Sequence, residues 1–463
     1  MSTNFYNSSV SITPKAINRP GLIHYLIFSP AIEITAMYMY YLRDCFAGFF
    51  RYTFQNLGAN SLWFIPDGMA FLCVGLFIIR HILIAKNLIA SMTVIWMMIS
   101  FVVAYFFFRD SLAVASGLKM IVPVFVGFCF CMRPVNEMKA VRYLFYVVFV
   151  FSCIGVVWNS FGPLAWEGYA YEGFGVGERA ASRQWWIAGG IPRLGGFAAD
   201  STMAGFFLMA GYAVLAVNMK IAMRLIVGVV AIYVTYITTS KTNLVAILFI
   251  FAILSFSWIL GKQKELKLLK SIAKYSYLTI LIPYILIILL NGVDLTDISQ
   301  SLYSMQDRIN NSWVLPIVYM ADLFPPGFVT GCGAGCFNYP MDLFPTAVQQ
   351  YYVPVDNFYY GSYLMFGIPF LLFLARHSFT QRPSDPAVII STIAMNLFAI
   401  TILCYGPASS LLLFGIIYSG NFSSKIWGKH VEEYHGGPRI LRSASYLGSI
   451  RSNAPVGGSL KSR

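Results

Sequence analysis

Apolar segments of about 20 residues recur along almost the whole chain, and only a lipid environment accommodates so many of them. Of the 463 residues, 58% are hydrophobic and 11% are charged, and the mean hydropathy is +0.68. The sequence therefore predicts an all-α integral membrane protein with about 12 transmembrane helices. The predicted spans are 21–41, 62–79, 88–108, 111–131, 143–161, 201–218, 222–239, 242–260, 275–291, 357–375, 387–405 and 407–420.

The basic residues predict how this bundle is oriented. Lys15 and Arg19 precede the first span, which places the N-terminus inside by the positive-inside rule. Every second loop is also basic, most densely from Lys262 to Lys274. The net charge of +13 is then a topology signal, and no folded basic domain indicates nucleic-acid binding. We expect a cytoplasmic tail 1–20, a membrane domain 21–420 and a disordered cytoplasmic tail 421–463.

Two outward loops, at about 162–200 and 292–356, are much longer than turns, and long loops in compact domains are usually functional. Both combine aromatic rings with carboxylates and guanidiniums, as in Trp185, Trp186 and Glu172 of the first loop and Trp313 of the second. Rings that cover the apolar faces of pyranoses, beside charged groups that bind hydroxyls, are typical of sugar recognition. An aromatic belt at the membrane interface is the alternative interpretation.

Basic residues on the outer side run against the orientation bias, so each of them requires a reason. Phosphate binding is one such reason, and a lysine that snorkels to the interface is the alternative for Lys241. Lys119 lies inside the fourth span, where a cation is a functional candidate by default. Glu33 and Asp67 also lie in apolar runs, and either pair with basic neighbours or lie near span ends. The outward candidates for phosphate binding are Arg183, Arg193, Lys241 and Arg308.

The remaining reactive residue types limit the chemistry. All five histidines fall on the predicted inner side, so an outer reaction would use a carboxylate as base or need no base. Cys332 and Cys336 lie in an outer loop, where their short spacing favours two free thiols over a disulfide. No CxxC, HExxH or His-rich tract indicates a metal site, and no cofactor is expected.

Four stretches, in this order and on these predicted sides, carry a family resemblance. They are R193-L-G-G-F-A-A-D-S-T-M-A-G205, T239-S-K-T-N243, D307-R-I-N-N-S-W313 with G331-C-G-A-G335, and V355-D-N-F-Y-Y-G-S-Y-L-M-F-G367. The chain resembles the O-antigen polymerase and ligase superfamily over most of 190–370, and its first half matches only as a hydropathy pattern. Lys241 stands where the family usually has Arg, and Asp356 stands where ligases usually have His.

The resemblance implies a GT-C-like architecture and glycosyl transfer at the outer face of a bacterial inner membrane, with both termini cytoplasmic. A glycan on undecaprenyl diphosphate would move to the terminal sugar of another lipid-linked repeat unit, with membrane lipid and a chain-length regulator as further partners. Diphosphate is a good leaving group, so a metal is not required. The implied sugar-binding residues are Glu172, Trp185, Trp186, Trp313, Asn357 and Tyr359. The implied diphosphate ligands are Arg183, Arg193, Lys241, Arg308 and Lys119, with Asp356 or Asp200 accepting the proton and Arg193 and Arg308 stabilising charge during catalysis.

Two other functions remain open at this stage. A ligase would use the same donor with a lipid A core acceptor, and the missing outer histidine disfavours it. A transporter or flippase of lipid-linked oligosaccharides would need no catalytic loop and would show internal repeats, of which the sequence has none that is convincing. Lys119, Glu33 and Asp67 keep that third interpretation open.

Overall fold

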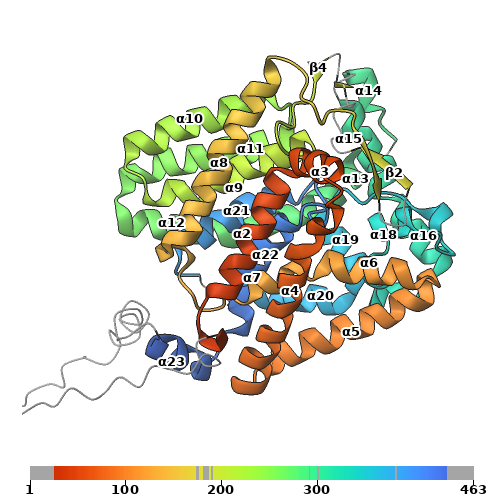
Figure 1. Cartoon of the computed structure of the whole chain (residues 1–463), viewed down its shortest axis with the longest axis horizontal. Helices are drawn as coiled ribbons and strands as arrows, with labels where there is room; N and C mark the ends of the chain where they lie inside the picture. The colour runs from red at the N-terminus through yellow and green to blue at the C-terminus, as the bar shows by residue number, and fades with distance from the viewer. Residues whose placement is uncertain are drawn as a thin grey trace, which may run out of the picture.

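The computed structural model describes residues 26–173, 177–180, 187–188, 191–290, 292–299, 302–380 and 383–434, and they form a helical bundle with two short hairpins (Figure 1). The first half contains α2 (Ala31–Cys45), α3 (Ala47–Asn56), α4 (Ile65–Phe77), α5 (Leu88–Phe108), α6 (Ser111–Ile121), α7 (Pro123–Phe128), α8 (Lys139–Ser160), α9 (Ser201–Leu215), α10 (Ile221–Ile237) and α11 (Lys241–Ser257). The second half contains α12 (Lys262–Ser276), α13 (Ile282–Leu290), α14 (Leu295–Ile298), α15 (Tyr303–Asp307), α16 (Leu315–Leu323), α17 (Gly327–Thr330), α18 (Tyr339–Leu343), α19 (Phe358–Phe366), α20 (Ile368–Thr380), α21 (Pro386–Phe398), α22 (Ala408–Tyr418) and α23 (Lys425–Tyr434). The strands β1 (Ala170–Gly173) and β2 (Gly177–Ala180) form one antiparallel hairpin, and β3 (Ile187–Ala188) and β4 (Ile191–Pro192) form the other.

The prediction of a helical membrane protein is confirmed. Among the described residues, six helical stretches are long and apolar enough to cross a membrane, and a helix occupies each of the twelve predicted segments. The predicted span 88–108 has the bounds of α5. Others are interrupted, because Pro123 separates α6 from α7 and Gly367, with φ of +65°, separates α19 from α20. The six described stretches that are long and apolar enough to cross a membrane are Asn60–Ile84, Leu88–Phe108, Ser111–Phe128, Lys139–Ser160, Ser201–Asn218 and Gln263–Leu290.

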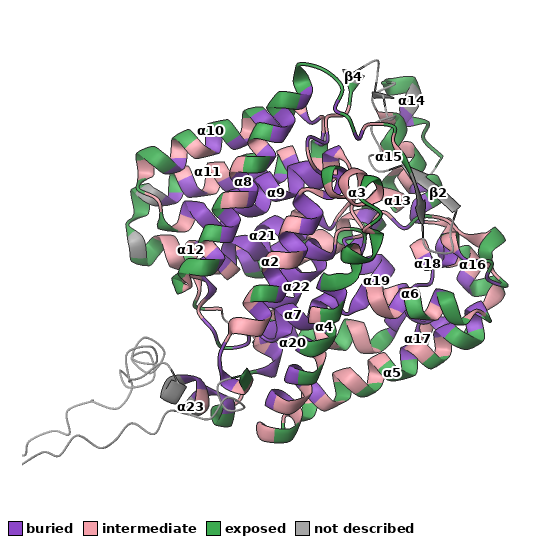
Figure 2. Ribbon diagram, in the orientation of Figure 1, coloured by how far each residue is buried: buried purple, intermediate pink, exposed green. Residues whose placement is uncertain are grey.

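The centre of the bundle is formed by α9, α21 and α22, which are buried along nearly their whole lengths (Figure 2). Small residues let the inner helices approach closely, as they do in membrane bundles generally. A Cβ atom on Gly415 of α22 would lie 2.9 Å from the Cα atom of Gly127 in α7. By contrast, α5 exposes Met92, Ile95 and Phe106, as expected of a helix that faces lipid.

The glycine-rich segment 331–337 is buried inside the bundle and does not lie on the surface of an outer loop. The backbone N–H groups of Cys332 and Ala334 donate to the carbonyls of Leu364 in α19 and Ser100 in α5, at 2.8 and 3.2 Å. Gly333 adopts φ of +97°, which an L side chain rarely adopts. Cys332 and Cys336 form a disulfide here, so the expectation of two free thiols was wrong. Residues four apart can be bridged because this segment turns sharply and is not extended.

The two ends of the bundle differ. The hairpins, α14 and α15 lie toward one end, here named the loop face, and α23 lies at the other, here named the tail face (Figure 1). Trp427 of α23 is fully buried, and its indole N–H donates to the carbonyl of Cys131 at 3.3 Å. The expected disorder from residue 421 onwards was therefore wrong as far as Tyr434, because one buried aromatic residue anchors this basic segment. Residues 435–463 lie outside the described residues.

Candidate functional site

The clearest polar contact on the loop face joins Arg308 to Asp356. Arg308 begins a π-helical turn, η8 (Arg308–Ser312), and Asp356 lies two residues before α19. The Nε atom of Arg308 lies 3.1 Å from Oδ2 of Asp356, and its Nη1 atom donates to the hydroxyl of Ser304 at 2.7 Å. Their side chains remain 22% and 39% exposed, so the pair is accessible to a ligand.

Although the side chain of Asp356 is 39% exposed, partial burial shifts the protonation of its carboxyl. Burial raises the pKa of its carboxyl, Arg308 lowers it, and Asp307 raises it further. The balance lies above the usual range of an aspartate, so this carboxylate is a stronger proton acceptor than an ordinary one.

Three residues predicted to bind sugar are buried close to Asp356, and one of them, Trp313, is hydrogen-bonded to it. Trp313 is buried against Leu295 and Ile309, and its indole N–H donates to the main-chain carbonyl of Asp356 at 3.4 Å. Asn357 caps α19 through the N–H of Tyr360 at 2.8 Å. Tyr359 is buried and hydrogen-bonded to Asn396. Trp313, Asn357 and Tyr359 are therefore packed against the protein in this structure, and their predicted contact with sugar stays a prediction.

Arg193 and Asp200 come from the stretch that leads into α9. Asp200 caps this helix, accepting a hydrogen bond from the N–H of Met203 at 2.8 Å. Partial burial lowers the pKa of Arg193, Arg308 lowers it further, and Asp200 opposes both. The two guanidiniums thus act on each other, although more than 100 residues separate them in the sequence. A bound anion would favour the charged form of Arg193 and so oppose this lowering of its pKa.

The glycines beside Arg193 pack the stretch against α8. Gly196 has φ of +58°, and a Cβ atom there would lie 2.7 Å from the main chain of Gly155. Its N–H donates to Asn159 at 3.1 Å and its carbonyl accepts from the indole of Trp166 at 3.0 Å. These glycines therefore position Arg193 by close helix–loop packing.

Lys241 begins α11. Hydrogen bonds connect this end of α11 to the N-terminal ends of α9 and α19. The amide of Asn243 donates to the carbonyl of Thr202 in α9 at 3.0 Å, and Thr242 bonds to Thr401. The adjacent Ile400 accepts from Asn357 at 2.9 Å. The N-termini of α9, α11 and α19 consequently gather at the loop face. Helix N-termini carry partial positive charge and favour anions.

Lys119 does not belong with these residues. Its ammonium lies 3.5 Å from Asp67, which also accepts from Tyr40 at 2.9 Å and from Arg43 at 3.4 Å. Asp67, Arg43 and Arg51 are the charges that act on Lys119. The prediction of Lys119 as a diphosphate ligand was therefore wrong in its grouping, because α6 directs the side chain to a separate ion cluster. Of the two alternatives for Glu33 and Asp67, pairing with basic neighbours is confirmed, since Glu33 lies 2.8 Å from Arg80.

Other predicted residues lie partly or wholly beyond description. Arg183, Trp185 and Trp186 lie outside the described residues, and Glu172 is described only as a backbone partner of Glu178 in the β1–β2 hairpin. Within the described ranges, no group of three or more His, Cys, Asp or Glu side chains is arranged to hold a metal ion.

Sequence reasoning missed Ser304, which orients Arg308. It named Asp67 as a residue that could pair with basic neighbours, but it did not identify the Arg43–Asp44–Asp67 cluster. The adjacent charges Arg43 and Asp44 at the end of an apolar run were a signal for that cluster. Nothing in the sequence indicated Ser304, whose contact depends on the helical spacing of α15 and η8. No protein-family model, curated protein sequence or solved structure matches this chain.

Proposed function

We propose that this protein is a polysaccharide polymerase of a bacterial inner membrane. It would transfer a glycan from undecaprenyl diphosphate to the terminal sugar of another lipid-linked repeat unit, outside the cytoplasm. The observation that carries the proposal is the ion pair of Arg308 and Asp356 at the loop face. Arg308 also lowers the pKa of Arg193, and the helix that begins with Lys241 is hydrogen-bonded to the helix that follows Arg193. Two guanidiniums with a proton-accepting carboxylate are the groups that such a transfer requires.

The chemistry follows from these groups. The donor's C1–O bond to the diphosphate breaks as a sugar hydroxyl of the acceptor attacks C1. Arg193, Arg308 and Lys241 stabilise the negative charge that develops on the departing diphosphate, and cations already in place do so without reorganisation. Asp356 accepts the hydroxyl proton, helped by its raised pKa. Asp200 is the second candidate for that role, although its carboxylate already caps α9.

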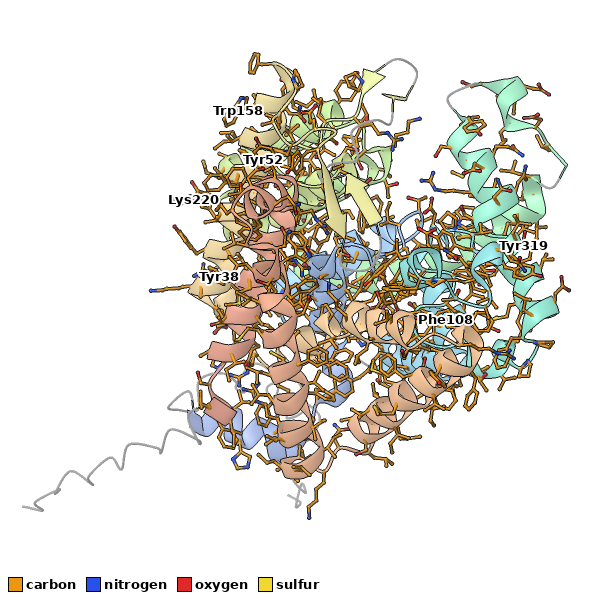
Figure 3. All side chains as sticks on the ribbon, turned by 45° about the vertical axis from the view of Figure 1, so that its right-hand side comes forward. Tyr38, Tyr52, Phe108, Trp158, Lys220 and Tyr319 are labelled. Atoms are coloured by element: carbon orange, nitrogen blue, oxygen red, sulfur yellow. A yellow bond between two sulfur atoms is a disulfide. The ribbon has the colours of Figure 1, made fainter. Side chains whose placement is uncertain are left out.

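An apolar groove supplies a path for the lipid. It lies between α8 and α10, has a volume of about 600 Å³, and is lined by Trp158, Phe161 and Tyr233. Trp158, labelled in Figure 3, lies near the upper end of the bundle in that view. Its ring centroid is 6.0 Å from that of Phe197, four residues after Arg193. A polyprenyl chain in this groove would place its diphosphate near the loop face.

A chain-length regulator is a further proposed partner of the protein.

The proposal includes twelve membrane crossings in a GT-C-like arrangement, with both termini and the basic helix α12 in the cytoplasm. Single cysteines at two exposed positions test it: Gln263→Cys in α12 and Gln350→Cys before α19. A membrane-impermeant thiol reagent should label intact spheroplasts only at residue 350. Labelling at residue 263 instead would invert the orientation and exclude the proposed reaction side.

Deletion of the gene tests the reaction class. Cells should then accumulate single lipid-linked repeat units and lose long polymer, and a plasmid copy should restore it. Long polymer that still forms but stays unattached to its acceptor would identify a ligase instead. The pairing of Glu33, Asp67 and Lys119 with neighbouring charges weighs against a transport pathway through them.

A further inference from the structure

A large apolar cavity lies in the half of the bundle nearest the tail face. It has a volume of about 440 Å³, which is within the range of ligand pockets. Met92 and Trp96 of α5 form one wall, Phe370 and Leu372 of α20 form the opposite wall, and Phe414 of α22 lies behind them. No step of the proposed transfer uses this cavity.

Most polar groups that line the cavity are already hydrogen-bonded within the protein. The hydroxyl of Thr93 already donates to the carbonyl of Ile89 at 2.8 Å, and the indole N–H of Trp96 donates to the carbonyl of Phe366 at 2.9 Å. The hydroxyl of Tyr405 is bonded to Ser362 at 2.8 Å. Arg376 and the hydroxyl of Tyr418 are the exceptions, and the rest of the lining is apolar. Water is held poorly by a mostly apolar lining, and a void left unfilled costs stability in proportion to its volume. An apolar occupant is therefore favoured.

The cavity opens sideways, toward lipid. Met92 and Leu372 stand on its two walls and are 61% and 65% exposed. The gap between α5 and α20 thus gives a hydrocarbon chain in the bilayer direct access to the interior.

The side chain of Arg376 provides a positive charge at the tail-face end of the cavity. Arg376 lines it near the end of α20, and α20 packs there against Phe422, whose ring centroid lies 6.1 Å from that of Phe373. Arg376 is exposed and takes part in none of the ion pairs found within the described ranges. An apolar slot that ends in an exposed guanidinium is complementary to one hydrocarbon chain with an anionic head.

We propose that this cavity binds one acyl chain of an anionic phospholipid, whose phosphate contacts Arg376 from the leaflet at the tail face. The proposed substrate lipid has its diphosphate at the opposite face, so its polyprenyl chain is not the expected occupant. The phospholipid would also stabilise the reaction site. Phe358 lines the cavity, stacks on Phe414 with centroids 4.0 Å apart, and follows Asp356 by two residues.

Native mass spectrometry of the detergent-purified protein tests the proposal. Wild-type protein should retain one phosphatidylglycerol per chain after exchange against excess phosphatidylcholine. Arg376→Gln should lower that retention about tenfold and Arg376→Lys should keep it, because a charge-assisted phosphate contact is lost only in the first variant. Lys220→Gln, at an exposed lysine before α10, is the charge-matched control and should retain the lipid (Figure 3).

A second pair of variants tests the slot itself. Thr93→Phe fills the cavity and should expel the lipid, whereas Met98→Phe, on the exposed side of the same helix, should not. The Arg376 variants alone decide the matter if Thr93→Phe fails to fold. Equal retention of phosphatidylcholine, unchanged retention in Arg376→Gln, a retained polyprenyl phosphate, or no retained lipid would each overturn the proposal.

Discussion

Two clusters of Arg and carboxylate side chains lie at opposite ends of this protein, and they differ in accessibility. At the tail face, Glu33 lies between Arg80 and Arg133, at 2.8 and 3.4 Å, and all three side chains are fully buried. At the loop face, Arg308 and Asp356 remain 22% and 39% exposed.

The two clusters differ in how far the protein shields them from solvent, and this difference indicates different roles. Arg80 and Arg133 also donate to the carbonyls of Ser29 and Phe28, at 2.9 and 2.6 Å, and Trp427 lies over both guanidiniums. The three side chains are closed off from solvent and bonded to groups of the protein itself, so we infer that this cluster holds helices together. At the loop face, Arg308 instead lowers the pKa of Arg193, and a bound anion would offset this repulsion between the two guanidiniums. Buried, closed charge is structural here, and open charge is available for function.

The largest expected effect is the loss of stability when the buried Glu33–Arg80–Arg133 cluster is disrupted. Glu33→Gln leaves two buried guanidiniums without their carboxylate, and breaking such a pair destabilises proteins by about 3–5 kcal/mol. We expect little protein in the membrane and a much lower melting temperature in detergent. Glu137→Gln, at an exposed glutamate on η3 (Val135–Glu137), is the control and should behave as wild type. An unchanged melting temperature for Glu33→Gln would remove the structural role.

The next largest effect is the loss of activity when Arg308 of the exposed Arg308–Asp356 pair is replaced. Arg308→Ala should lower polymerisation about 10²- to 10³-fold, the usual cost of one charge-stabilising donor, with normal protein levels. Arg308→Lys should also lose most activity, because an ammonium cannot bond to Asp356 and Ser304 as a planar guanidinium does. Arg109→Gln, at an exposed arginine between α5 and α6, is the matched control. Full activity in Arg308→Ala would contradict its place in the site.

A smaller loss, about a hundredfold, is expected for Asp356→Asn, which cannot accept a proton. In the wild type the active form is the carboxylate, so the rate should fall as pH drops through the pKa of Asp356. Burial raises that pKa, so this fall should occur at higher pH than for an ordinary aspartate. The rate of polymer formation in reconstituted vesicles, measured against pH, tests this. A wild-type profile flat down to the usual aspartate range would move the role to Asp200.

The smallest effect is expected at Lys241. Lys241→Arg should stay within about threefold of wild type, because it retains the charge and adds donors, whereas Lys241→Ala should lose about tenfold. Radiolabel incorporation into polymer measures both. Equal rates for the two variants would show that the charge at Lys241 is not used.

The sequence predicted what depends on local pattern and missed what depends on packing. The hydropathy runs predicted a helix in every segment, including the bounds of α5. The few outward cations, which run against the positive-inside bias, directed attention to Arg193 and Arg308, and Arg308 lowers the pKa of Arg193 in the structure. Trp313 and Tyr359 have the residue types of a sugar platform, and only tertiary packing determines that they face inward. Lys119 was grouped wrongly because nothing in its own helix indicates Asp67 or Arg43 as neighbours.

The buried position of 331–337 could not have been predicted either. Its glycines and polar neighbours are typical of a surface loop. The backbone groups become satisfied only because Ser100 and Leu364, from distant segments, accept their hydrogen bonds.

The central claim is that Arg193, Lys241 and Arg308 bind one diphosphate. An electron cryo-microscopy structure with a non-transferable undecaprenyl diphosphate glycan analogue tests it most directly. We expect phosphate density within about 4 Å of the Arg193 and Arg308 guanidiniums and of the Lys241 ammonium, the range of charge-assisted contacts. The analogue's first sugar should then lie beside Asp356. Diphosphate density at the Lys119–Asp67–Arg43 cluster instead, with Arg193 and Arg308 unchanged, would contradict the claim.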